Sequence, residues 1–312
     1  MSRHPVRFGV CLPQHGSSFT DAVAVARACD RLGFDSIWAV DHFYGIPDAT
    51  TDILEGWTEI AALAPLTERV KLGHLVLCVS YRQPAVLAKM AATLDRVSNG
   101  RFVLGIGAGW HQQEYHGYGI PFPTIGARLK QLDEALTIVR KLWTEEPVSF
   151  FGEHFHIEDA YCRPRPLQAP HPPILVGGTG ERVLLRIVAE HADVWNNLGW
   201  AHRQLEEKSA VLRRHCDAVK RDFAAIEISQ QTIAAIARDE RAARAATAEI
   251  QSELAFLSGG EDLIIAGTPA ECIERVERTV RMGATSLVLS FGRNPSIEML
   301  ELFAETVIPA FR

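Results

Sequence analysis

Short apolar runs, rich in β-branched residues, alternate along the chain with segments whose apolar residues recur at helical spacing. The runs predict eight strands, at residues 6–12, 36–40, 70–79, 101–107, 173–178, 193–197, 226–236 and 285–291. The helical pattern separates most of them, notably at residues 20–33, 84–97, 127–145, 180–191, 203–222 and 270–282, with a final helix at about 296–311. Near-continuous apolar strands are typical of a parallel sheet buried on both faces.

The number and order of these elements decide the fold class. Eight strands alternating with helices in a chain of 312 residues favour an α/β fold, a closed (β/α)8 TIM barrel with loop insertions, over an open sheet. We expect one such domain over residues 1–312. Its active site should lie at the carboxyl ends of the strands, where the loops that lead into the helices meet.

Composition and charge exclude several classes of protein. With 47% hydrophobic and 22% charged residues, the chain has the composition of an ordinary globular protein. A formal net charge of −6 without a long basic run argues against nucleic acid or an acidic membrane as a partner. No apolar run reaches the roughly 18 residues of a membrane span and the N-terminal residues lack a signal-peptide core, so a cytoplasmic location is expected.

The cysteines and histidines do not predict a metal site. The six cysteines include no CxxC pair and no cluster, which indicates reduced thiols rather than a disulfide framework or a zinc ribbon. His154 and His156 lie in a segment that predicts a short hairpin, and they lack an obvious third ligand.

The sequence GIGAGW at residues 105–110 is a glycine-rich turn between a predicted strand and a downstream helix. Such glycines let backbone N–H groups lie against a ligand, which suggests cofactor binding, although close packing would also explain them. The turn imitates the dinucleotide fingerprint GxGxxG, which needs a helix at once and an acid about 20 residues later. Here the following HQQEYHGYGIPFPT is too interrupted to open a helix directly, and Arg128 and Lys130 occupy the region of the acid, so a Rossmann domain is disfavoured.

Polar residues and glycines gather where the predicted strands end. They are Gln14 and His15 after the first strand, Asp41 and His42 after the second, Cys78 to Tyr81 after the third, Ala108 to Trp110 after the fourth and Gly177 to Gly180 after the fifth. An irregular loop at residues 45–52 follows the second strand, and loops of this kind in compact folds are usually functional or mobile. We expect this loop to close over a substrate.

Four segments in order, WAVDHF, YRQPAVLAKMAATLDRVSNGRFVLGIGAGW, YGIPFP and PRPLQAPHPPILVGGTG, together resemble the bacterial luciferase-like superfamily of flavin and deazaflavin enzymes. The resemblance spans about residues 6–200. The Asp-His pair and the GxGAGW turn are most similar to the branch that uses the deazaflavin coenzyme F420. The resemblance implies an oxidoreductase that passes a hydride between the deazaflavin and a small organic substrate, in a direction that the sequence leaves open.

The resemblance also implies roles for single residues. His42 would exchange a proton with the substrate, in keeping with an imidazole that titrates near neutral pH, and Asp41 would lie against the coenzyme ring. Leu75–Val76 would be a non-proline cis peptide behind the ring. The implied cofactor-binding residues are Asp41, Leu75, Val76, Cys78, Gly107, Ala108, Gly109, Gln113, Gly177, Gly178 and Gly180, the last three offering backbone amides at a helix N-terminus to the phosphate-bearing tail. Gln14, His15 and Trp110 are expected to line the substrate pocket.

Two departures from the family pattern and three alternatives stay open. Cys78 stands where relatives often have a small hydroxyl, and Trp110 stands where a sugar-phosphate dehydrogenase branch has an acidic catalytic residue, which makes that branch's substrate an unexpected one here. An FMN-dependent monooxygenase served by a partner flavin reductase keeps the same fold, and a non-catalytic deazaflavin-binding protein needs no proton-transfer group. A metal-dependent hydrolase is disfavoured because the first strand ends in Gln14-His15 without an HxH pair. Related barrels lead us to expect a homodimer.

Overall fold

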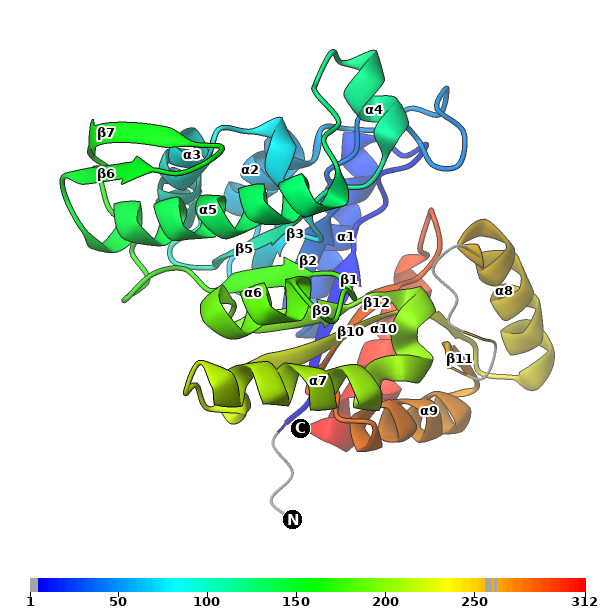
Figure 1. Ribbon diagram of the computed structural model, residues 1–312. Coiled ribbons are helices and arrows are strands. Elements are labelled where there is room, and N and C mark those ends of the chain that lie inside the picture. Colours follow the sequence, from blue (N-terminus) through cyan, green and yellow to red (C-terminus); the bar gives the residue numbers. More distant parts are fainter. Residues whose placement is uncertain (1–4, 256–259, 261–262) are drawn as a thin grey trace.

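The computed structural model describes residues 5–255, 260 and 263–312, and the parallel strands of this part close into a barrel (Figure 1). In barrel order the strands are β1 (Arg7–Cys11), β2 (Ser36–Ala39), β3 (Lys71–His74), β5 (Phe102–Gly107), β8 (Ile174–Gly177), β9 (Val194–Asn197), β10 (Glu227–Ile236) and β12 (Ser286–Ser290). The last strand pairs in parallel with the first, which places Phe8 opposite Leu287. The predicted (β/α)8 barrel is confirmed. The predicted domain also includes residues 1–4, 256–259, 261 and 262, which lie outside the described part.

Helices cover the outside of the barrel. They are α1 (Phe19–Leu32), α3 (Pro84–Val97), α5 (Ile125–Thr144), α6 (Leu184–His191), α7 (Leu205–Ala218), α9 (Pro269–Arg281) and α10 (Ile297–Thr306). Local sequence starts and ends them: Ser18 and Asp21 form a capping box on α1, and Gly33 ends that helix at a φ of 81°. The indole N–H of Trp143 on α5 donates to the carbonyl of Ala88 on α3 at 2.9 Å, which joins these two helices.

Alternating side chains along the strands build two separate apolar layers. Large residues such as Phe8, Ile37 and Leu72 point outward and pack beneath the helices. A smaller cluster fills the interior of the barrel and consists of Trp38, Leu75, Val103, Leu175 and Val288. The barrel is therefore a packed core, so that a ligand must bind at one of its ends.

The remaining elements are insertions and short additions. They are α2 (Gly56–Leu63), β4 (Leu77–Cys78), α4 (Gln112–Gly117), the hairpin β6 (Val148–Phe151) with β7 (His156–Ala160), α8 (Glu240–Glu253), β11 (Ile265–Gly267) and the 3-10 turns at Ala64–Leu66, Val79–Tyr81, Gly199–Gln204, Phe223–Ala225 and Ile308–Phe311. The hairpin with His154 and His156 is confirmed as an element. In Figure 1, α4 stands at the end of the barrel opposite the C-terminus, where the strands finish.

Three expectations about these elements are wrong. A helix, α4, does open directly after the glycine turn, because its Glu114 gains partners from a distant loop that the local sequence does not reveal. The run 70–79 is two strands, β3 and β4, interrupted at the Leu75–Val76 peptide, which is cis as the resemblance implied. The helix expected from residue 180 begins at Leu184.

Among the described residues, no helix is both long enough and apolar enough to span a bilayer.

Candidate functional site

His42 and Asp41, which follow β2, belong to two different hydrogen-bond networks. Nδ1 of His42 lies 3.0 and 3.1 Å from the two carboxylate oxygens of Glu114 on α4. The same carboxylate accepts the backbone N–H groups of Phe43 at 2.6 Å and Tyr44 at 3.0 Å, and the hydroxyl of Tyr81 at 2.8 Å. Glu114 is fully buried, and its partners lie far from it in the sequence.

The charge of Glu114 determines which nitrogen of His42 carries a proton. Burial raises the pKa of this carboxyl, but the hydrogen bond and charge of His42, together with the Tyr44 amide and the Tyr81 hydroxyl, outweigh burial and lower the pKa to about 2. An ionised carboxylate accepts hydrogen bonds only, so Nδ1 of His42 donates to it. Nε2 is therefore the ring nitrogen available to exchange a proton with a ligand.

Aromatic and imidazole rings surround His42. The ring of Trp110 meets it edge to face, with centroids 5.6 Å apart, and Trp110 is 59% exposed. Phe43 stacks on Tyr81 at 4.5 Å. A planar apolar ligand would find extensive contact area at this end of the barrel.

The loop at residues 45–52 is tied to two neighbouring loops across the barrel end. Nδ1 of His15 accepts the N–H of Ile46 at 3.2 Å, and Arg293 donates to the carbonyl of Ile46 at 3.0 Å. Burial, followed by the charges of His42 and Arg293, lowers the pKa of His15 to about 4, so this imidazole is neutral at pH 7. These two bonds hold the loop beside His15, and its closure over a substrate stays a prediction.

Asp41 is buried and joins the end of β2 to β4. Arg82 donates to its two oxygens at 2.8 and 3.0 Å, and the N–H of Cys78 donates at 2.8 Å. The sulfur of Cys78 lies 2.9 Å from the hydroxyl of Tyr115, and burial raises the pKa of this thiol to about 11, so it stays protonated. The structure gives Asp41 a positioning role in addition to the predicted contact with a coenzyme ring, which stays a prediction.

Gln14 also connects two strand ends through hydrogen bonds of its side-chain amide. Its amide accepts the N–H of Val40 and donates to the Val40 carbonyl at 3.3 Å, and the residue is 2% exposed. A buried amide held in this way has a structural role, while its predicted contact with substrate is untested.

Val76 explains why glycine is needed on two neighbouring strands. A Cβ on Gly107 would lie 2.8 Å from one methyl group of Val76, and a Cβ on Gly177 would lie 2.9 Å from the other. Val76 is half-buried, whereas Leu75 and Leu77 are buried. The Val76 side chain, which follows the cis peptide, therefore leaves room only for glycine at positions 107 and 177. We call the half-buried surface of Val76 the apolar floor.

The other predicted cofactor residues differ in what they can offer. Gly109, at a φ of 73°, lies against Cys78 and Tyr115, Ala108 is half-buried, and Gln113 is exposed. The N–H of Gly178 donates to the carbonyl of Asn196 at 3.2 Å, so the expectation that this amide is free for a phosphate is wrong. Its carbonyl accepts the indole N–H of Trp195 at 2.9 Å. For Gly177 and Gly180, binding of the phosphate-bearing tail stays a prediction. The helix α6 begins only after both residues, at Leu184.

Sequence reasoning missed the acid that organises the site. Glu114 and His42 are 72 positions apart, so no local spacing connects them. The only signal is an acidic residue within the segment HQQEY directly after the glycine turn. Arg82 was missed for the same reason, whereas Tyr81 was among the residues expected at the strand ends.

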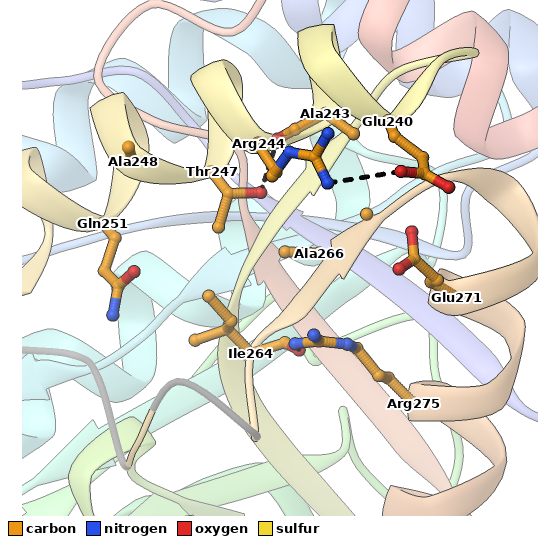
Figure 2. A pocket seen from close by; sticks show the side chains of 11 residues that line it. Glu240, Ala243, Arg244, Thr247, Ala248, Gln251, Ile264, Ala266, Glu271 and Arg275 are labelled. Carbon is orange, nitrogen blue, oxygen red and sulfur yellow. Dashed lines mark hydrogen bonds and ion pairs between the residues drawn. The ribbon is translucent and has the colours of Figure 1, made fainter.

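A cavity lies away from the strand ends, between α8, β11 and α9 (Figure 2). This cavity of about 240 Å³ has charged side chains in its lining. They form local pairs: Arg244 with Glu240 at 3.2 Å on the same helix, and Glu271 with the Thr268 amide at 2.7 Å in a capping box. Because these contacts serve the helices themselves, we place the function at the strand ends.

Comparison with known proteins identifies the family of this chain. The family model described as luciferase-like monooxygenase matches residues 6–259. The chain belongs to this family. The luciferase-like chain is 31% identical over 206 residues to an uncharacterized protein of Mycobacterium tuberculosis, covering 61% of this chain and 71% of that protein. It is 27% identical over 319 residues to an F420-dependent glucose-6-phosphate dehydrogenase of Amycolatopsis mediterranei, covering 94% of each.

A solved structure supports the fold of this luciferase-like protein. An F420-dependent secondary alcohol dehydrogenase in complex with an F420-acetone adduct superposes with a TM-score of 0.83 at 21% identity, covering 99% of this chain and 100% of that chain. The predicted resemblance to the luciferase-like superfamily is confirmed, and so is the prediction of an oxidoreductase enzyme.

Proposed function

We propose that this luciferase-like enzyme uses coenzyme F420 to transfer a hydride to or from a small organic substrate, with His42 as the proton donor or acceptor. The observation that carries the proposal is the contact of His42 Nδ1 with the ionised Glu114 at the carboxyl ends of the strands. The relative named as an F420-dependent dehydrogenase, which aligns along 94% of the chain, supports the cofactor assignment.

The residues at the strand ends fit a flat deazaflavin ring. Val76 presents a half-buried apolar surface, and the glycines at positions 107 and 177 keep the neighbouring strands from displacing it. Near the position proposed for the anionic tail, Lys208 donates to the carbonyl of Thr179 at 3.0 Å and pairs with Glu181 at 3.0 Å, so the tail would have to share this ammonium with Glu181. When bound, the coenzyme would supply the hydride donor or acceptor.

The chain's own residues would handle the proton. Oxidation of an alcohol carbon releases the hydroxyl proton, and Nε2 of His42 would accept it while Glu114 stabilises the imidazolium that forms. In the reverse direction the imidazolium would return the proton to the carbonyl oxygen. Trp110 and the loop at residues 45–52 would exclude water around these atoms.

The substrate pocket of this proposal consists of Trp110, His15 and Gln14. Trp110 stands where a sugar-phosphate dehydrogenase branch of the family has an acidic catalytic residue. The proposed substrate is therefore an uncharged alcohol, ketone or related compound rather than the substrate named for the relative. We also propose a homodimer located in the cytoplasm, for which size measurement in solution and cell fractionation are the tests.

An FMN-dependent monooxygenase is the second candidate, because the matching family model is named for monooxygenases. It would need a partner flavin reductase and oxygen. Separate fluorescence titrations with F420 and with FMN distinguish the two, since each chromophore reports its own binding. Tighter binding of F420 supports the proposal, whereas a micromolar preference for FMN with substrate-coupled oxygen uptake contradicts it. Tight F420 binding without turnover over a broad panel of substrates would indicate a carrier.

A further inference from the structure

Two imidazoles, rather than one, face the buried carboxylate of Glu114. Nδ1 of His42 lies 3.0 Å from its Oε2, and Nδ1 of His111 lies 3.3 Å from the same oxygen. All three ligand atoms lie within 4.8 Å of one another. The two rings are nearly perpendicular, with centroids 5.7 Å apart.

The second imidazole is the feature that the proposed reaction does not use. Nδ1 of His111 is buried and has no hydrogen-bond partner among the residues that the structure describes, because its approach to Glu114 lacks hydrogen-bond geometry. A buried ring nitrogen without a partner is uncommon, and coordination of a metal ion is one explanation for such an atom.

The carboxylate is already oriented for an additional ligand. The backbone N–H groups of Phe43 and Tyr44 donate to Oε1, whereas Oε2 accepts the hydroxyl of Tyr81 at 2.8 Å and faces both histidines. In a tetrahedral site with metal–ligand bonds of about 2.0–2.1 Å, neighbouring ligand atoms are roughly 3.3 Å apart, close to the separations seen around Oε2.

We propose that His42, His111 and Glu114 form a binding site for a borderline divalent transition-metal ion such as Zn²⁺, and that occupation of this site inhibits the enzyme. Imidazole nitrogens with one carboxylate oxygen are a donor set that Zn²⁺ takes, and the fourth position would hold water. The sequence predicted no metal here because His42 and Glu114 approach only through the fold.

The inhibition follows from the tautomer that a bound metal would impose on the His42 imidazole. A metal on Nδ1 of His42 requires that Nε2 carry the proton of the neutral imidazole. Nε2 can then no longer accept a proton, and it can donate one only by forming an imidazolate. Inhibition therefore rests on the proposed function, whereas metal binding does not.

A second group with metal-ligand spacing provides a control. It consists of Asp133, Glu190 and His191 on α5 and α6. There Arg186 already pairs with Glu190 at 2.6 Å and approaches Asp133 at 3.7 Å, so a cation would have to displace a guanidinium. We expect this second group to bind Zn²⁺ much more weakly.

Calorimetric titration of the full chain with Zn²⁺, without coenzyme, tests the binding. We expect one saturable site, which His111→Ala weakens by more than about 100-fold, since even the partners of metal ligands are worth about 10–100-fold in affinity. His191→Ala should bind as the wild type does. Co²⁺ should give a tetrahedral absorption spectrum that His111→Ala abolishes. His111→Asn and circular dichroism check that loss of binding is not loss of folding.

The outcomes separate the metal site from the catalytic proposal. No saturable binding, or binding that His111→Ala leaves unchanged, overturns the site, and loss of binding in His191→Ala assigns the ion to the second group. Zn²⁺ should inhibit turnover of the wild type, and His111→Ala should keep basal turnover while losing most of this inhibition. Zinc binding without F420-dependent turnover would refute the proposed function and leave the metal site standing.

Discussion

The strand-end site around Glu114 and the region around α8 both carry charged side chains, but the interactions of these side chains have different ranges along the sequence. Glu114 binds residues 33 to 72 positions away and is fully buried. In the α8 region, Glu240 and Arg244 are four positions apart on one helix, with both side chains more than 70% exposed. Local exposed pairs stabilise a helix slightly, whereas a buried charge with several distant partners needs the whole fold to assemble it. The contrast supports our proposal that the functional site lies at the strand ends.

The largest expected effect is that of His42→Ala. The chemical step should slow by about 10²–10⁴-fold, the range for losing a positioned proton-transfer group, while F420 affinity stays unchanged. Single-turnover kinetics and the pH–rate profile are the measurements, and the limb due to His42 should vanish. If the variant kept the wild-type rate and pH profile, His42 would have no catalytic role. The strand-end site would then no longer differ in function from the α8 region.

Glu114→Gln tests whether charge, rather than shape, matters at the strand ends. We expect the chemical step to slow by about 10–100-fold, equivalent to the roughly 1.5–3 kcal/mol of a hydrogen bond to a charged group. The matched control is Glu240→Gln on α8, which should leave the rate unchanged. Equal rates in both variants would contradict the positioning role of Glu114.

The same variant changes the pH dependence of stability. In the folded protein the pKa of Glu114 is about 2, against an ordinary 4.5, so its stabilisation is complete above about pH 4.5 and is lost as pH falls through about 2. Urea denaturation between pH 7 and 3 should show a smaller acid loss in Glu114→Gln than in the wild type.

Gly107→Ala tests the apolar floor. Its Cβ would lie 2.8 Å from Val76, so we expect a destabilisation of about 1–3 kcal/mol, the usual cost of overpacking. The double variant with Val76→Ala should recover part of this loss. Gly126→Ala on α5 is the matched control, because its nearest neighbour would be 3.9 Å away, and it should be neutral or stabilising by up to about 1 kcal/mol. Equal urea midpoints for the two single variants would contradict the packing argument.

The smallest expected effect lies in the α8 region. Arg244→Ala removes an exposed ion pair and should cost no more than about 0.5 kcal/mol of unfolding free energy, with turnover and coenzyme affinity unchanged. A loss of activity in thermally stable Arg244→Ala would show that the α8 region belongs to the function.

Local sequence patterns were enough to predict seven of the eight barrel strands as single runs, most of the helices and the end of the barrel that carries the candidate site. Apolar runs and capping residues act over a few neighbours, which is why α3 was predicted at its observed bounds, Pro84–Val97. Gly107 and Gly177 were also found from sequence, but their common cause, the side chain of Val76, was not visible there.

Which polar groups contact one another depends on the folded barrel and could not be predicted from local sequence. The Gly178 amide, expected to face a ligand, binds Asn196 because β8 and β9 pair beside it. Arg82 reaches Asp41, and Glu114 reaches His42, across loops that have no common sequence period. A charge can be buried only where distant donors converge on it, and that convergence is a property of the closed barrel rather than of any segment of the chain.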